Sequence, residues 1–324
     1  MEWKFNIQDL DSLQEYYSRL EKKRDLLKSK RPLSNAVLNK LRNDLQLEWT
    51  YNSNSIEGNT LTLQETKIVL QDGMTVKGKS MREHFEATNH HNAIEYLEKT
   101  VKPDYLLNEK DILHINYLIL QNIEKEFAGR YRNGGVRIVG ANFTPPNALK
   151  VSNLMEELVA WTNENPLNLN VLALATIFHH RFVYIHPFFD GNGRSVRLLM
   201  NIILMKDGYP PAIILKNDRK KYYQALNFAN NGDYSKLFLL VAQAQERSLN
   251  IYLNSFPTTN YDDEYLEIND ILEDGSIPYG QEYISLLART GKIDAYKEGK
   301  NWLTSKTAVK QYIKNRKRKR KLDD

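Results

Sequence analysis

Apolar residues recur along most of this chain at the three- and four-residue spacing of amphipathic helices. Residues 167–184 are apolar on nearly every face, which is typical of a helix buried inside a protein. We therefore expect a mainly α-helical fold with this segment in its core. The spacing predicts helices over residues 9–28, 34–50, 62–72, 79–99, 106–126, 167–184, 198–205, 216–231 and 238–252.

One stretch departs from the helical spacing. Apolar and polar residues alternate around Val136 and Ile138, and glycines lie on both sides. This pattern predicts a short strand, which we expect to return as a second strand near Ala148 to Val151. The simplest interpretation is a structural β-hairpin that covers part of the core.

A polar loop over residues 186–197 separates the two most apolar helices. Pro187 biases His186 toward an extended backbone and should end the preceding helix there. The loop then opens into the next helix, whose first N–H groups have no partner within the helix. Gly191 and Gly193 let an anion approach these groups without a Cβ in the way. Phosphate is therefore the expected ligand.

Four side chains of this loop fit phosphate chemistry. Arg194 and Arg197 are three residues apart, hence on one helix face, and guanidinium groups bind phosphate oxygens in pairs. Asp190 can hold Mg²⁺, which prefers one or two carboxylates together with phosphate oxygens. His186 can accept a proton near neutral pH. Each of these features alone is common in unrelated proteins. Their occurrence together and in this order indicates attack on a nucleotide phosphate.

These residues also carry a resemblance to a known family. Their order, His-x-Phe-x-Asp-Gly-Asn-Gly-Arg-x-x-Arg, resembles position for position the motif of the Fic family of protein adenylyltransferases. Such enzymes transfer AMP from ATP to a hydroxyl of Ser, Thr or Tyr in a target protein. The resemblance implies that His186 is the general base and that Asp190 binds Mg²⁺. It further implies that ATP contacts Gly191, Asn192, Gly193, Arg194, Ser195, Val196 and Arg197 at the phosphates, Val139, Gly140, Ala141 and Asn142 beside the nucleotide, and Tyr223 and Asn230 at the adenosine.

A second motif lies upstream, at Ser53, Glu57 and Gly58. An acidic residue next to a glycine at a helix end is commonly only a solvated last turn. Beside the loop at 186–197, however, the spacing resembles the inhibitory motif of Fic proteins, carried by a helix of the same chain at about residues 34–58. A carboxylate from Glu57 can take the guanidinium of Arg197 that the γ phosphate needs. The resemblance therefore implies autoinhibition.

The resemblance extends to a flap and to a small C-terminal domain. The strand near Val136 resembles the Fic flap, on which a target segment pairs through its main chain. After a linker over 255–263, residues 264–318 resemble a winged helix-turn-helix module of DNA-binding proteins. Its candidate reading helix at 281–290 is neutral, whereas contacts to phosphate need cations. Basic residues in the tail at 314–324 can supply them, so DNA binding stays open.

The composition limits the kinds of site that the chain can have and the compartment that we expect for it. The chain has 324 residues, no cysteine and a formal charge of +5. Because residues 310–324 hold eight Lys or Arg and two Asp, the rest of the chain sums to about −1. Disulfides and thiolate zinc sites are excluded. The start of the chain lacks the pattern of a signal peptide and no apolar run is long enough for a membrane span, so we expect a cytoplasmic protein.

The sequence thus predicts an N-terminal helical region at 1–100, a Fic catalytic core at 101–254, the winged-helix domain and the basic tail. The cofactor expected is Mg²⁺, with ATP as co-substrate. Two further functions stay open: removal of AMP with Glu57 activating water, and a DNA-associated regulator. A homodimer also stays open. Histidines 84, 90 and 91 are interpreted as surface or capping residues rather than as a metal site.

Overall fold

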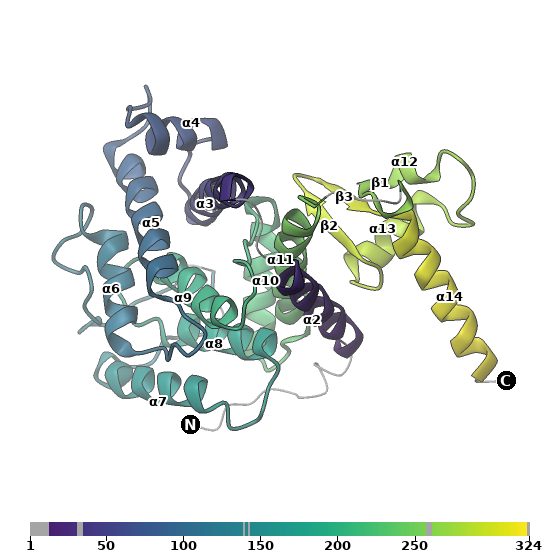
Figure 1. The fold of residues 1–324 in the computed structure, drawn as a ribbon. Coiled ribbons are helices and arrows are strands. Elements are labelled where there is room, and N and C mark those ends of the chain that lie inside the picture. The colour runs from purple at the N-terminus through teal and green to yellow at the C-terminus, as the bar shows by residue number, and fades with distance from the viewer. Residues whose placement is uncertain (1–12, 31–34, 139, 142, 257–260, 323–324) are drawn as a thin grey trace.

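The computed structural model describes residues 13–30, 35–138, 140–141, 143–256 and 261–322, which form a helical body with a smaller module at its side (Figure 1). The expected mainly α-helical fold is confirmed. The α-helices of the body are α2 (Gln14–Ser29), α3 (Asn35–Ile56), α4 (Leu63–Lys67), α5 (Met81–Thr100), α6 (Glu109–Leu120), α7 (Val151–Glu164), α8 (Val171–Ile185), α9 (Asn192–Lys206), α10 (Arg219–Asn230) and α11 (Ser235–Leu253). Short turns of other helix types are η1 (Ile68–Asp72), η2 (Ala148–Lys150) and η3 (Lys216–Asp218).

The core surrounds α8 and α9, which pack side by side. Phe178 and Phe182 of α8 are fully buried, as its apolar sequence predicts. The other body helices lie around this pair: α2 packs on α11, α3 on α5, and α7 on α8. Side chains from residues 13–97 and from residues 107–249 share one hydrophobic cluster. The helix of the candidate inhibitory motif and the helix of the polar loop therefore belong to one packed body.

The C-terminal module has its own hydrophobic core. Its three-stranded antiparallel sheet has the strand order β1-β3-β2, in which Tyr296 of β2 pairs with Leu303 of β3. Figure 1 shows the sheet next to α11, which β2 contacts. The winged-helix assignment stays a prediction. The elements are β1 (Leu266–Glu267), α12 (Ile268–Leu272), α13 (Gln281–Arg289), β2 (Ala295–Glu298), β3 (Asn301–Thr304) and α14 (Lys306–Leu322), and the linker before them includes η4 (Tyr261–Asp263).

The predicted β-hairpin at residues 136–151 is not found among the described residues. Residues 148–150 form η2 and Val151 begins α7, because Val151, Leu154, Met155 and Leu158 bury one helical face. Around Val136 and Ile138 the described residues have no strand pairing, and the sheet lies in the C-terminal module instead. A single extended stretch without a partner strand cannot form a ladder, so alternation over a few residues was too weak a signal.

Candidate active site

The polar loop begins where α8 ends. His186 caps that helix, and its N–H donates to the Phe182 carbonyl at 2.9 Å. Its backbone is left-handed, with φ 50° and ψ 63°. The expected extended backbone before Pro187 is therefore wrong, although the helix ends at the predicted place. A left-handed conformation is unfavourable for a residue with a Cβ, so the surrounding contacts must hold it.

Arg132 supplies the most extensive of these contacts. Its guanidinium is buried and donates to four carbonyls: His186 (2.8 Å), Ile185 (3.3 Å), Gly134 (2.9 Å) and Pro146. The backbone N–H of Arg132 donates to the Pro187 carbonyl at 2.9 Å. One side chain thus ties the segment before α7 to the backbone of His186. Arg132 is a site residue that the sequence did not single out.

Asn192 braces the loop from its other end. Its side-chain oxygen accepts from the Phe188 N–H at 2.9 Å, and its amide donates to the Phe188 carbonyl at 2.8 Å. The Phe188 ring is fully buried and packs against Tyr131 and Phe182. The Asn192 side chain therefore fixes the shape of the loop. A ligand would meet the backbone of the glycine turn rather than the side chain of Asn192.

Burial sets the charge state of His186. Removal from water lowers the pKa of the imidazole to about 4, and the nearby charge of Arg132 acts in the same direction. The ring is therefore neutral at neutral pH. A neutral imidazole can accept a proton, which is the state that a general base requires.

The N-terminus of α9 is open to an anion. Its N-cap is Gly191, with φ 78°, and no side chain caps the first N–H groups. A Cβ at Gly193 would overlap the Glu57 carboxylate. Glycine at this position therefore lets a carboxylate lie directly over the helix end, where the helix dipole favours negative charge.

That carboxylate also meets Arg197. Glu57 Oε1 lies 2.8 Å from Arg197 Nη2. The same guanidinium donates to the Ser53 hydroxyl at 3.1 Å and to the Ser53 carbonyl at 2.8 Å. Arg197 is buried, and Nη1 has no hydrogen-bond partner within the described part of the chain. Gly58, with φ 107°, turns the chain away after Glu57. The structure thus brings together residues that are about 140 positions apart in the sequence.

Arg194 lies on the same helix, buried beside two carboxylates. Its guanidinium is 3.4 Å from Glu86 and 3.4 Å from Asp190. These separations are long for hydrogen bonds, and among the residues that the structure describes its buried Nε has no partner. A buried guanidinium with unused donors is suited to an anionic ligand, because an unpaired charge is costly to bury.

Asp190 is the candidate metal ligand. One carboxylate oxygen accepts from the Gly191 N–H at 2.6 Å, and the other lies 2.9 Å from Arg82 of α5. Its side chain is 35% exposed, and that of Arg82 is 49% exposed. Within the described ranges, no group of three or more metal-ligating side chains comes together. A single carboxylate still fits Mg²⁺, which takes most of its ligands from phosphate and water.

The remaining candidates for ATP binding lie in several places. Val139 and Asn142 fall outside the described residues, and Gly140 and Ala141 lie between them in the segment before η2. Tyr223 lies beside the end of α3, with its hydroxyl 3.5 Å from the Ile56 carbonyl. The side-chain oxygen of Asn230 meets His180 Nε2 at 2.8 Å. Ser195 and Val196 are both fully buried.

Two of the histidines of α5, His84 and His90, have different surroundings. His84 lies at the start of the helix, where its ring bonds the Ser80 carbonyl (2.7 Å) and accepts from the Val76 N–H (2.8 Å). His84 is buried and the caps of α5 are Ser80 and Glu83, so its interpretation as a surface or capping residue is wrong. His90 is fully buried, so its interpretation as a surface residue is wrong. It lies under the site, where burial and then the charges of Arg197 and Arg194 lower its pKa.

Sequence reasoning missed three residues besides Arg132. Asn116 of α6 donates to the Asp190 carbonyl at 3.1 Å and accepts from Gly129, and Arg82 meets the Asp190 carboxylate. Arg219 donates to the Ile56 carbonyl at 2.7 Å, one residue before Glu57. A lone polar residue such as Asn116 inside an apolar helix face was the available signal.

Comparisons with known proteins agree with this geometry. The model of the Fic/DOC family matches residues 106–204. Protein adenylyltransferase Fic from Culex quinquefasciatus is 38% identical over 249 residues, which are 76% of this chain and 49% of that protein. A Fic-1 fragment from C. elegans is 31% identical with a TM-score of 0.69, over 75% of this chain and 72% of the fragment.

A Fic family protein from Desulfovibrio desulfuricans, 23% identical, shares the fold with a TM-score of 0.62 over 90% of this chain and 95% of its own. The chain spans about half the length of the adenylyltransferases that it matches. Within the described residues, no helix is both long and apolar enough to cross a membrane. From the geometry of the loop at residues 186–197 and these similarities together, the chain belongs to the Fic/DOC family.

Proposed function

We propose that this protein transfers AMP from ATP to a hydroxyl of Ser, Thr or Tyr in a target protein. One observation carries the proposal: His186, half-buried and neutral, shares a short loop with an open helix N-terminus and two buried arginines. A base and an anion site are thereby adjacent in the chain and rigidly connected. The names of the relatives, protein adenylyltransferase Fic, support the same activity.

His186 acts as the general base of the reaction. It takes the proton from the target hydroxyl as the oxygen attacks the α phosphorus of ATP. The new bond joins that oxygen to phosphorus, the bond between the α phosphorus and the bridging oxygen breaks, and pyrophosphate leaves with the electron pair. The neutral state that burial imposes on His186 is the state in which it can accept the proton.

The phosphates bind at the N-terminus of α9. Its free N–H groups and the guanidinium of Arg194 suit the inner phosphates, and Arg197 suits the γ phosphate. Gly193 leaves room above the helix end, where an added Cβ would overlap the Glu57 carboxylate that lies there. Gly140, Ala141, Tyr223 and Asn230 are our candidates around the nucleoside.

Mg²⁺ fits this site through Asp190. One oxygen of the Asp190 carboxylate meets the exposed Arg82 side chain, which can withdraw, while the other oxygen stays on the Gly191 N–H. A bound Mg²⁺ would neutralise charge on the phosphates. The loop itself is held by Asn192 and Arg132, so it does not depend on the ion for its shape.

We infer that Glu57 restrains the activity. It lies 2.8 Å from Arg197 and over Gly193, where a γ phosphate would need the same guanidinium. Bound ATP would then be held out of line with the target hydroxyl. Because a displacement of about 1 Å can cost on the order of 100-fold in rate, one carboxylate suffices as an off switch.

The wider organisation follows from these roles. We infer that residues 101–254 form the catalytic core, that α3 carries the inhibitor, and that a target segment binds along residues 130–147. A cytoplasmic setting agrees with the absence of cysteine. DNA binding by residues 264–318 and a homodimer stay predictions.

Removal of AMP from modified proteins is a second candidate. The Glu57 side chain is 33% exposed, and its charge acts on His186, so it can activate a water near the loop. Loss of AMP from a premodified protein is the measurement. The removal of AMP should stop in Glu57→Ala, and continued removal in that variant would exclude this role of Glu57.

Adenine-labelled ATP tests the proposed function. The wild type, Glu57→Gly and the double variant Glu57→Gly, His186→Ala are each incubated with labelled ATP, Mg²⁺ and a cell lysate. We expect weak labelling of proteins by the wild type, stronger labelling by Glu57→Gly and none by the double variant. Absence of labelling by Glu57→Gly would contradict the proposal.

A further inference from the structure

The last two turns of α3, which end just before Glu57, are held by the segment from η3 into α10. Asn52 accepts from the Lys216 N–H at 2.9 Å, and the Ile56 carbonyl accepts from Arg219 at 2.7 Å. Lys216 also lies over the Tyr51 ring and reaches its hydroxyl at 3.0 Å. The position of Glu57 therefore depends on residues 216–219 as well as on Arg197.

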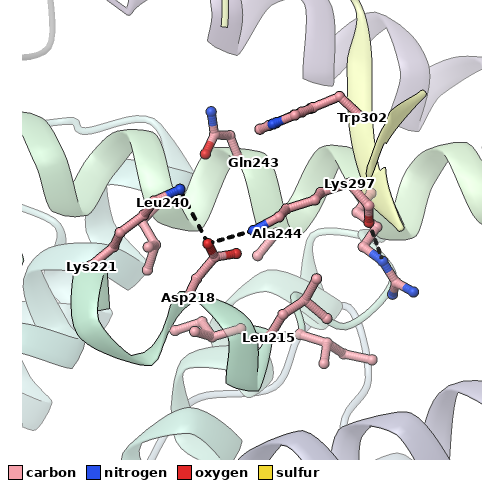
Figure 2. Close-up of a pocket in the computed structure, with 11 residues that line it drawn as sticks. Leu215, Asp218, Lys221, Leu240, Gln243, Ala244, Lys297 and Trp302 are labelled. Atoms are coloured by element: carbon pink, nitrogen blue, oxygen red, sulfur yellow. Dashed lines mark hydrogen bonds and ion pairs between the residues drawn. The ribbon is translucent and has the colours of Figure 1, made fainter. Parts of the chain in front are cut away.

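The C-terminal module touches the same segment from its other side. Lys297 of β2 forms an ion pair with Asp218 at 2.8 Å, and each side chain is 16% exposed. Asn217 donates to the Gly299 carbonyl at 3.1 Å. Figure 2 shows Lys297 and Lys221 both directed at Asp218. Residues 297–299 are thus one layer of side chains away from the support of the inhibitory helix.

Arg247 of α11 joins the module to α3 directly. Its Nε donates to the Lys297 carbonyl at 2.9 Å, while Nη1 lies 2.8 Å from the Glu48 carboxylate. The Arg247 side chain is 7% exposed. Loss of one partner of a buried cation is costly, so a shift of the β2–β3 hairpin would weaken the hold on Glu48 as well.

The contact between the β2–β3 hairpin and residues 215–218 is loosely packed. A cavity lies between the hairpin and the body, lined by Leu215, Leu240 and Ala244 on one side and by Lys297 and Trp302 on the other (Figure 2). Polar contacts around a cavity leave less apolar area buried than continuous packing would, and apolar burial is the main stabilising term in most interfaces. When the hairpin moves, Lys297 and Asp218 can each bind water in place of the other.

We propose that the C-terminal module is a regulatory brace for the inhibitory glutamate. While the β2–β3 hairpin rests on Asp218 and Arg247, residues 48–56 of α3 are held and Glu57 stays on Arg197. When the hairpin moves away from Asp218 and Arg247, the hold on α3 weakens and Arg197 becomes available to the γ phosphate. This inference rests on the proposed function, because it names the regulation of that same site.

Full-length point variants test the brace. Lys297→Met removes the pair with Asp218 and leaves Lys221 on that carboxylate, while Glu48→Gln weakens the contact with Arg247. Lys300→Met, an exposed lysine at the tip of the same hairpin, is the matched control. Because Glu57 keeps Arg197 as a partner, we expect the first two variants to raise AMP transfer by about threefold to tenfold and the control to leave it unchanged.

The background variant shows whether the effect passes through Glu57. In Glu57→Gly, the change Lys297→Met should add nothing, since no inhibitor is left to release. Equal activation by Lys297→Met in both backgrounds would overturn the inference. If Glu57→Gly itself fails to transfer AMP, the proposed function fails, and that result is distinct from failure of the brace.

Hydrogen exchange tests the brace without any activity. The amides of residues 52–58 should exchange about threefold or more faster in Lys297→Met and in Glu48→Gln than in the wild type or in Lys300→Met. Equal exchange in all four proteins would overturn the inference, whatever their transfer rates.

Discussion

His186 lies at the end of α8 and Glu57 lies over the N-terminus of α9, and the structure holds them in different ways. The loop of His186 is fixed by buried side chains that bond to backbone atoms. Arg132 donates to the carbonyls of Ile185 and His186, and Asn192 bonds both the N–H and the carbonyl of Phe188. Glu57 is 33% exposed and is held by one ion pair at the end of a helix. The base is built to stay in place, whereas the inhibitor can leave.

This difference has an energetic basis. A buried polar group that loses its partner bears the full cost of desolvation, so the contacts of Arg132 and Asn192 are costly to break. Glu57 loses less when it leaves, because water can replace the arginine at its carboxylate, and a phosphate can take its place on the buried guanidinium of Arg197. Regulation is therefore expected on the side of Glu57, and rigidity on the side of His186.

The largest effect should come from removal of the base. His186→Ala, made in the Glu57→Gly background, should lower the rate of AMP transfer by about 100-fold to 10,000-fold, the usual contribution of a general base. Initial rates of labelling measure the loss. Thermal unfolding is the control, and a transfer rate that stays within twofold of the parent would show that His186 is not the base.

A smaller loss should follow from weakening the fixed side. Arg132→Lys keeps the charge but cannot donate to four separate carbonyls. We expect kcat to fall by about 100-fold in the Glu57→Gly background, since His186 would be misplaced, with a smaller change in the KM for ATP. An unchanged kcat with a raised KM would instead assign Arg132 to nucleotide binding.

Protonation of buried histidines should lower stability in acid. Burial lowers the pKa of His186 and of His180 to about 4, and that of His179 to about 3. Between these values and about 6.5, the unfolded chain binds more protons than the folded one, so the free energy of unfolding falls as pH falls. Each histidine contributes up to about 1.4 kcal/mol per pH unit within this window.

Urea unfolding from about pH 7 to pH 5 measures this slope. His180→Gln, which can still bond to the hydroxyl of Tyr234 and to Asn230, should reduce it. A slope that stays the same in this variant would mean that the pKa of His180 is the same in the folded and the unfolded chain.

The smallest effect is expected at Asp190. Arg82→Ala removes the cation on the exposed carboxylate oxygen, so Mg²⁺ in the presence of ATP should bind about twofold to fivefold more tightly, in line with a surface ion pair worth about 1 kcal/mol or less. Calorimetric titration measures the affinity. Arg82→Lys is the control, and weaker binding in Arg82→Ala would mean that Arg82 holds phosphate.

Much of the site was predictable because its residues are adjacent in the sequence. The spacing of Arg194 and Arg197, the glycine turn and His186 needed only local rules, and the resemblance supplied the distant partner Glu57. The structure places Glu57 on Arg197. Arg132 could not be found in this way, since its acceptors come from segments before and after it that meet only in the folded chain.

The fold shows the same limit. Helices with strong periodicity such as α8 and α11 were predicted, with differences of a few residues at their ends. α7 was missed although Val151, Leu154, Met155 and Leu158 carry the helical spacing, because the stretch before it was interpreted as a strand. The left-handed backbone of His186 was also beyond local rules, since contacts with Arg132 and Phe182 impose it.

The position of the label in ATP tests the central claim most directly. Glu57→Gly protein is incubated with Mg²⁺ and with ATP labelled either on the α phosphate or on the γ phosphate, and label bound to protein is measured. If His186 directs a hydroxyl at the α phosphorus, the α label becomes attached to protein and the γ label leaves with pyrophosphate. Attachment of the γ label, or of neither, would contradict the account.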